Sequence, residues 1–203
     1  AAARAGKDDH IDVVIGRDLV DGGIQVAHPN SLTIYGQSEG SGRLTATAPA
    51  ESNIYHAAIG GSTNVQIWEV NYCGSVTING GDVTAIAGVT EDSTRYYWPK
   101  GIGIGLWHDG TVTINGGNIN ASTVYSGAGI GGYYADVAIH GGNIEATGSG
   151  ESNFPPSVGI GSGKSLLIDG GVIHAYGKGG AAGIGGANVW KTEKYTENAS
   201  LLI

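Results

Sequence analysis

VTINGGNINAS, residues 112–122, contains the pattern that decides the fold of this chain. An apolar residue, a variable residue and isoleucine precede a polar residue and a glycine pair, and a second alternating run follows the glycines. Four other segments have a related pattern: LTIYGQSEGSGRLTAT at 32–47, VTINGGDVTAI at 76–86, VAIHGGNIEAT at 137–147 and LLIDGGVIHAY at 166–176. Internal repetition of this kind is typical of solenoids, in which each repeat stacks on its neighbours.

A second, glycine-rich block follows each of these segments. The blocks are HAAIGG at 56–61, GIGIG at 101–105, GAGIGG at 127–132, SVGIGSG at 157–163 and AAGIGG at 181–186. Each unit therefore has three apolar anchors, which in the unit beginning at residue 112 are Ile114, Ile119 and Ile130. The flanking residues alternate between apolar and small polar types, and this period of two indicates short, half-buried strands.

The spacing of the units predicts how the strands are arranged. The anchor isoleucines lie 25 to 44 residues apart, at Ile34, Ile78, Ile114, Ile139, Ile168 and Ile203. A constant motif at variable spacing indicates coils separated by loop insertions, and each glycine pair would form a tight corner between two strands. The sequence therefore predicts an all-β fold, a right-handed parallel β-helix of about 6–7 coils. Hairpins of an antiparallel sandwich would not be expected to repeat the same two blocks in the same order.

The two ends of the chain are less regular than its middle. Residues 1–30 are expected to form an N-terminal segment with the first coils or a cap, and residues 31–203 the β-helix repeats. NASLLI at 198–203 resembles the beginning of another unit without its glycine corner, so the last coil is expected to be incomplete. Open solenoid ends expose strand edges, which would allow end-to-end self-association.

Composition excludes several classes of protein. The 38 glycines follow no G-X-Y period and only 5 prolines accompany them, which excludes collagen. The formal net charge of −8 would repel a phosphate backbone, so nucleic acid is not expected as a partner. The longest apolar runs are far shorter than the ~20 residues that span a bilayer, so no membrane insertion is expected. Cys73 is the only cysteine and cannot form an intramolecular disulfide.

LTIYGQSEGSGRLTATA from residue 32, with the repeated INGG and AGIGG blocks after it, resembles the glycine-rich repeat regions of large surface proteins of gut-type Gram-positive bacteria. The resemblance covers roughly residues 31–203. Some of those regions are described as carbohydrate-binding domains, so the resemblance implies an extracellular or cell-surface setting and a glycan ligand. The second unit departs from the pattern, with IGIGLW in place of GIGG and a long insertion at 87–100.

Aromatic residues concentrate where the coils are interrupted. Because equivalent positions of a solenoid are stacked, their rings could line one edge as a platform for sugar rings. The candidate glycan-binding residues are Tyr97, Trp98, Trp107, Asp109, Tyr133, Tyr134 and Trp190, with Asn115, Asn118, Asn120 and Asn143 as polar neighbours. The alternative is that the aromatic side chains only cover loops and corners.

Acidic and histidine residues give less support for catalysis or metal binding. The acids on or near the repeat are Asp82, Asp109, Glu145 and Asp169, and Arg95 is the only arginine beyond residue 43. A lyase or glycosidase needs facing acid and base groups, so no catalytic residue is predicted. The six histidines are scattered singly, and no metal or cofactor is predicted. His140 and Asp169 share a column with Asn79 and Asn115, which we expect to be an external polar ladder.

Three functional hypotheses follow from these patterns. The first is a non-catalytic extracellular surface module that is adhesive or binds polysaccharide or glycoprotein glycans through an aromatic edge. The second is a structural stalk or filament subunit that assembles by end-to-end stacking of coils. The third is a polysaccharide lyase or glycosidase.

Overall fold

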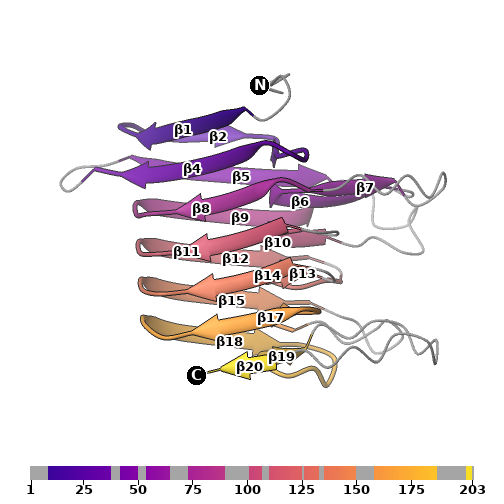
Figure 1. Cartoon of the computed structure of the whole chain (residues 1–203). Helices are drawn as coiled ribbons and strands as arrows, with labels where there is room; N and C mark the ends of the chain where they lie inside the picture. Colours follow the sequence, from indigo (N-terminus) through magenta and orange to yellow (C-terminus); the bar gives the residue numbers. More distant parts are fainter. Residues whose placement is uncertain are drawn as a thin grey trace.

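The computed structural model describes residues 9–37, 42–49, 54–64, 73–89, 101–106, 110–124, 126–132, 135–149, 158–186 and 200–202. Three sheets wind around one axis as a right-handed parallel β-helix, with one strand of each sheet in each complete coil (Figure 1). The predicted fold class is therefore confirmed.

The three sheets take their strands in turn along the chain. Sheet A contains β1 (His10–Ile15), β4 (Ser31–Gly36), β8 (Ser75–Ile78), β11 (Gly110–Ile114), β14 (Ala135–Ile139), β17 (Ser165–Ile168) and β20 (Ser200–Leu202). Sheet B contains β2 (Leu19–Asp21), β5 (Arg43–Pro49), β9 (Asp82–Val89), β12 (Asn118–Thr123), β15 (Asn143–Gly148) and β18 (Val172–Gly177). Sheet C contains β3 (Ile24–Gln25), β6 (Ile54–Gly60), β10 (Gly101–Gly105), β13 (Ile130–Gly132), β16 (Ile160–Ser162) and β19 (Ile184–Gly186), and β7 (Ser62–Asn64) pairs antiparallel with β6.

The anchor isoleucines of sheet A form one continuous buried column. Ile114 is in register with Ile78 on one side and Ile139 on the other, and Ile139 is in register with Ile168. Their exposed fractions run from 0% to 7%. Full burial of such a side chain stabilises the folded state by about 1.5–3 kcal/mol. Residues far apart in the sequence are thus axial neighbours, as the repeat predicts; Ile203 lies outside the described residues.

The corners between sheets A and B are formed by the glycine pairs. The second glycine of each pair has a positive φ, with values of 95° at Gly81, 106° at Gly117, 104° at Gly142 and 98° at Gly171. Residues that have a Cβ atom rarely adopt this backbone conformation, which explains why glycine recurs at this position. The predicted glycine corners are confirmed.

Replacing Gly117 with alanine is expected to lower the free energy of unfolding by about 2 kcal/mol, because the backbone of alanine is strained at this positive φ. It would also lie 2.7 Å from the carbonyl oxygen of Gly81. Gly116→Ala is the matched control: its Cβ would meet only the carbonyl oxygen of Asn79, at 3.5 Å. Urea unfolding followed by circular dichroism compares the two variants, and an equal loss in both would contradict the role given to the positive φ.

Sheets B and C approach each other closely because small residues face the interior. Ala121 and Ala146 of sheet B are fully buried. A Cβ on Gly129 would lie 2.7 Å from the backbone nitrogen of Thr147, and one on Gly159 would lie 2.6 Å from that of Tyr176. The glycines before β13 and β16 therefore leave room for the backbone of sheet B. The repetition of these blocks is evident in the sequence, whereas this role of their glycines depends on the distance between the sheets.

Candidate functional site

The outer face of sheet B carries its outward side chains in three axial columns. Alternation along each strand directs every second residue away from the core, as the burial pattern of β12 and β15 shows. The in-register pairing of β5, β9, β12, β15 and β18 then aligns equivalent residues along the axis. The first column contains Arg43, Asp82, Asn118, Asn143 and Val172; the second contains Thr45, Thr84, Asn120, Glu145 and His174; the third contains Thr47, Ile86, Ser122, Thr147 and Tyr176.

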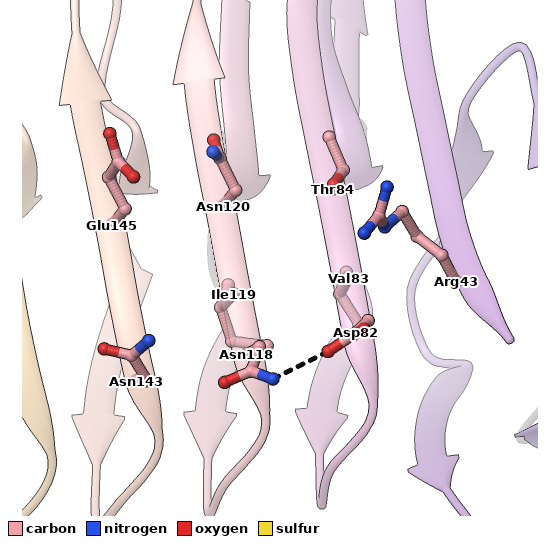
Figure 2. A pocket seen from close by; sticks show the side chains of 9 residues that line it. All are labelled: Arg43, Asp82, Val83, Thr84, Asn118, Ile119, Asn120, Asn143 and Glu145. Carbon is pink, nitrogen blue, oxygen red and sulfur yellow. Dashed lines mark hydrogen bonds between the residues drawn. The ribbon is translucent and has the colours of Figure 1, made fainter. Parts of the chain in front are cut away.

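A shallow depression of about 400 Å³ lies over part of this face. Its lining residues come from β5, β9, β12 and β15: Arg43, Asp82, Val83, Thr84, Asn118, Ile119, Asn120, Asn143 and Glu145. Figure 2 shows two rows of side chains that cross the strands, with Asn143, Asn118 and Asp82 in one row and Glu145, Asn120 and Thr84 in the other. The depression therefore extends along the helix axis over several coils.

The depression offers mainly amide and carboxylate groups for hydrogen bonding. Nδ2 of Asn118 donates to Oδ1 of Asp82 at 2.8 Å, which orients both side chains (Figure 2). Asparagine presents two N–H donors and a carbonyl acceptor, and an ionised carboxylate presents acceptors only. Arg43 adds one guanidinium at the β5 end of the depression, where Figure 2 shows its side chain turned toward β9. Such a surface suits a ligand with many hydroxyl groups, each of which can both donate and accept.

The structure brings together three of the asparagines that the sequence analysis named. Asn118, Asn120 and Asn143 all line the depression. Asp82 and Glu145, considered there only as catalytic acids, line it as well. Asn115 lies outside this set, in the corner column between sheets A and B. All residues of the predicted aromatic platform lie outside the described residues: Tyr97, Trp98, Trp107, Asp109, Tyr133, Tyr134 and Trp190.

Tyr176 is an aromatic residue of this face that the sequence analysis missed. It lies on β18 in register with Thr147, and 52% of it is exposed. The aromatic residues of the predicted platform come from the interruptions between coils, whereas Tyr176 lies within the repeat LLIDGGVIHAY. The alternation after the glycine pair predicts that Tyr176 points outward, because Ile173 and Ala175 of the same strand point toward the core.

The corner column forms the external polar ladder that the sequence predicts. Nδ2 of Asn115 donates to Oδ1 of Asn79 at 2.7 Å, and Nδ1 of His140 lies 2.7 Å from Oδ1 of Asp169. All four groups lie in the turn that follows the buried isoleucines, where their backbone nitrogens continue the axial hydrogen bonding of sheet A. Within the described ranges, no three His, Cys, Asp or Glu residues are placed to hold a metal ion.

A further polar cluster lies on β1 and β4 of sheet A, in the first two coils. Nδ1 of His10 lies 2.6 Å from Oγ of Ser31, and Nε2 of His10 lies 3.0 Å from Oδ1 of Asp12. The side chains of His10 and Asp12 are 51% and 56% exposed, so water competes for these contacts. We therefore interpret this cluster as a surface hydrogen-bond network.

No helix long and apolar enough to cross a membrane occurs in the part of the chain that the structure describes.

Comparison with known proteins agrees with this geometry. A family model described as a β-helix repeat matches residues 76–105, 112–132, 137–164 and 167–188. Each match begins in or directly before a strand of sheet A and ends in or just beyond a strand of sheet C, so that one repeat corresponds to one coil. No curated protein and no solved structure matches the chain significantly. Residues 76–188 are therefore a β-helix repeat region.

Proposed function

We propose that this protein is a non-catalytic module that binds glycans through the outer face of sheet B. The observation that carries the proposal is the depression over β5, β9, β12 and β15, in which Asn118, Asn120 and Asn143 are held in register beside Asp82 and Glu145. Sugar hydroxyls bind well to amide and carboxylate groups, because each hydroxyl can donate to one and accept from another.

Rigidity supports the same proposal. The lining side chains project from paired strands above a fully buried core, which includes Ile144 and Ala146. A site whose backbone is already ordered loses little conformational entropy when the ligand binds. A sugar must displace water from every group that it contacts, so that each hydrogen bond gives only a small net gain in binding free energy, and it therefore benefits from this ordered scaffold.

Charge favours a sugar over a phosphate-bearing ligand at this face. Arg43 is accompanied in the lining by Asp82 and Glu145, and the whole chain has a formal net charge of −8. An anionic polymer would be repelled by this balance. The setting that we propose is extracellular or at the cell surface, in keeping with the resemblance of the repeats to bacterial surface proteins.

Replacing Asn120 or Asn143 with alanine is expected to weaken glycan binding about fivefold each, because each change removes hydrogen bonds of about 1 kcal/mol. Affinity electrophoresis in gels containing xylan, glucomannan, mixed-linkage glucan or galactan measures the effect, and pull-down on insoluble cellulose and chitin extends the panel. Thr113→Ala is the control, since Thr113 lies on the strand of sheet A in the same coil as Asn120.

Two results would contradict the proposal. One is retention of full affinity by Asn120→Ala and Asn143→Ala when Thr113→Ala also binds normally. The other is the absence of binding to every glycan in the panel. Release of new reducing ends during the same incubations would identify a polysaccharide-degrading enzyme instead. Sedimentation of the unliganded protein as large particles would favour the filament hypothesis, which stays a prediction.

A further inference from the structure

Tyr176 gives the outer face of sheet B an aromatic group at one end. Six large apolar side chains are exposed among the described residues, and two of them, Val172 and Tyr176, lie on β18. β18 pairs with β15, so Tyr176 follows Thr147 in the third column, while His174 follows Glu145 in the second. The aromatic ring and the polar groups of the depression are thus on one continuous face, one strand apart.

The columns of outward side chains run along the helix axis, and this favours one orientation of a long ligand. Along the axis, the second column presents Thr84, Asn120, Glu145 and His174 on consecutive strands, which are about 4.8 Å apart. Across the axis, a single strand presents only a few outward groups before the chain turns at a glycine corner. A polymer that lies along the axis over the second column therefore meets a polar group at every strand and, on β18, passes beside Tyr176, which is two residues from His174. A polymer that lies across the axis meets the groups of one strand only.

We propose that the ligand is a linear, uncharged polysaccharide that lies along the helix axis from β9 to β18 and stacks one sugar ring on Tyr176. This inference rests on the proposed function and adds the orientation, the class of glycan and the stacking residue. β-1,4-linked chains of glucose, mannose or xylose are extended, and their successive rings recur at a distance close to one strand spacing. The flat faces of their rings carry C–H groups, which pack on an aromatic ring.

The absence of charge follows from the side chains along this path. Asp82 and Glu145 both lie along it, and Arg43 contributes a single guanidinium at its β9 end. A chain of uronic acids would place a carboxylate beside these carboxylates at close to the strand spacing, which electrostatic repulsion disfavours. A neutral chain can instead donate its hydroxyl protons to the same groups.

Isothermal titration with cello-, manno- and xylo-oligosaccharides tests the inference on the full chain. For the series that binds, affinity is expected to rise steadily from the disaccharide to the tetrasaccharide and then to level off, because β9, β12, β15 and β18 are then covered. Tyr176→Ala is expected to lower the affinity for the tetrasaccharide about tenfold, and Tyr176→Phe is expected to keep it, because stacking does not need the hydroxyl group. Oligogalacturonates are expected to bind at least tenfold more weakly.

Tyr35→Ala is the matched control, because Tyr35 is also an exposed tyrosine, 38% accessible, on a strand of sheet A. Circular dichroism and the unfolding midpoint verify that each variant is folded. If Asn120→Ala weakens binding but Tyr176→Ala does not, or if affinity does not change beyond the disaccharide, the axial orientation is wrong while glycan binding by this face stands. Equal binding of oligogalacturonates overturns the preference for an uncharged chain. If none of these oligosaccharides binds while a polysaccharide of the panel does, the class of glycan is wrong; if nothing in the panel binds either, the proposed function itself fails.

Discussion

Replacing Gly129 with alanine is expected to lower the free energy of unfolding by about 3 kcal/mol. The new Cβ would lie 2.7 Å from the backbone nitrogen of Thr147 and 2.8 Å from the carbonyl oxygens of Ala121 and Gly159. These are backbone atoms of three different strands or turns, so no side-chain rotation can relieve the contacts. β13 would have to move away from sheet B, and this would strain its axial bond from the backbone nitrogen of Ile130 to the carbonyl oxygen of Gly159 in the next coil.

Gly22→Ala is the control for the chemical change itself. Gly22 is exposed, and a Cβ there would meet no atom within 4 Å. Its effect on stability is expected to stay within about 0.5 kcal/mol. Urea unfolding of both variants gives the comparison, and hydrogen exchange shows where the helix opens, since coils contact only their neighbours. If Gly129→Ala were as stable as Gly22→Ala, the close approach of sheets B and C would be wrong.

Replacing Ile139 with alanine is expected to cost about 4 kcal/mol. Ile139 is fully buried on β14 and lies between Ile114 and Ile168 in the axial column of sheet A. Truncation removes apolar contact and leaves a cavity that the hydrogen-bonded strands on either side cannot close. Ile139→Val removes a single methylene and is expected to cost about 1 kcal/mol. The series is measured as free energies of unfolding in urea.

Val20→Ala is the control for loss of apolar surface without a cavity. Val20 is 82% exposed on β2, so its truncation is expected to change stability by less than about 0.5 kcal/mol. A graded loss from Val20→Ala through Ile139→Val to Ile139→Ala is the expected order. Similar losses in all three variants would show that the isoleucine column does not stabilise the helix in the way that its burial indicates.

The stability of these interior columns bears directly on the candidate site. The outward groups of sheet B owe their register to the inward groups of the same strands, because Asn118 and Asn120 flank Ile119, and Asn143 and Glu145 flank Ile144. Loss of the interior packing would therefore separate the polar columns as well. This coupling is the reason for testing each binding variant for folding before its affinity is interpreted.

Part of the candidate site was predictable from the residues. The repeat placed Asn118, Asn120 and Asn143 at outward positions, and the structure groups them in the depression. Asp82 and Glu145 were visible as acids of the repeat, but their place beside those asparagines was not recognised. Tyr176 is not among the predicted site residues, because the predicted platform takes its aromatic residues from the interruptions between coils and Tyr176 lies inside a repeat. Tyr97, Trp98, Trp107, Asp109, Tyr133, Tyr134 and Trp190 remain predictions, since they lie outside the described residues.

The parallel β-helix, the axial isoleucine column and the glycine corners follow from the residues alone, because the motif that recurs along the chain aligns its isoleucines when the coils stack in phase, and because the corners need backbone angles that only glycine adopts readily. The tertiary structure decided the rest. It showed that Gly129 and Gly159 leave room for the backbone of sheet B. It also showed that the outer face of sheet B carries Arg43, Asn120, Glu145 and Tyr176. Local alternation states only whether a side chain points inward or outward. Which outward side chains meet depends on the register between strands that long loops separate in the chain, and this register is fixed only when the coils have stacked.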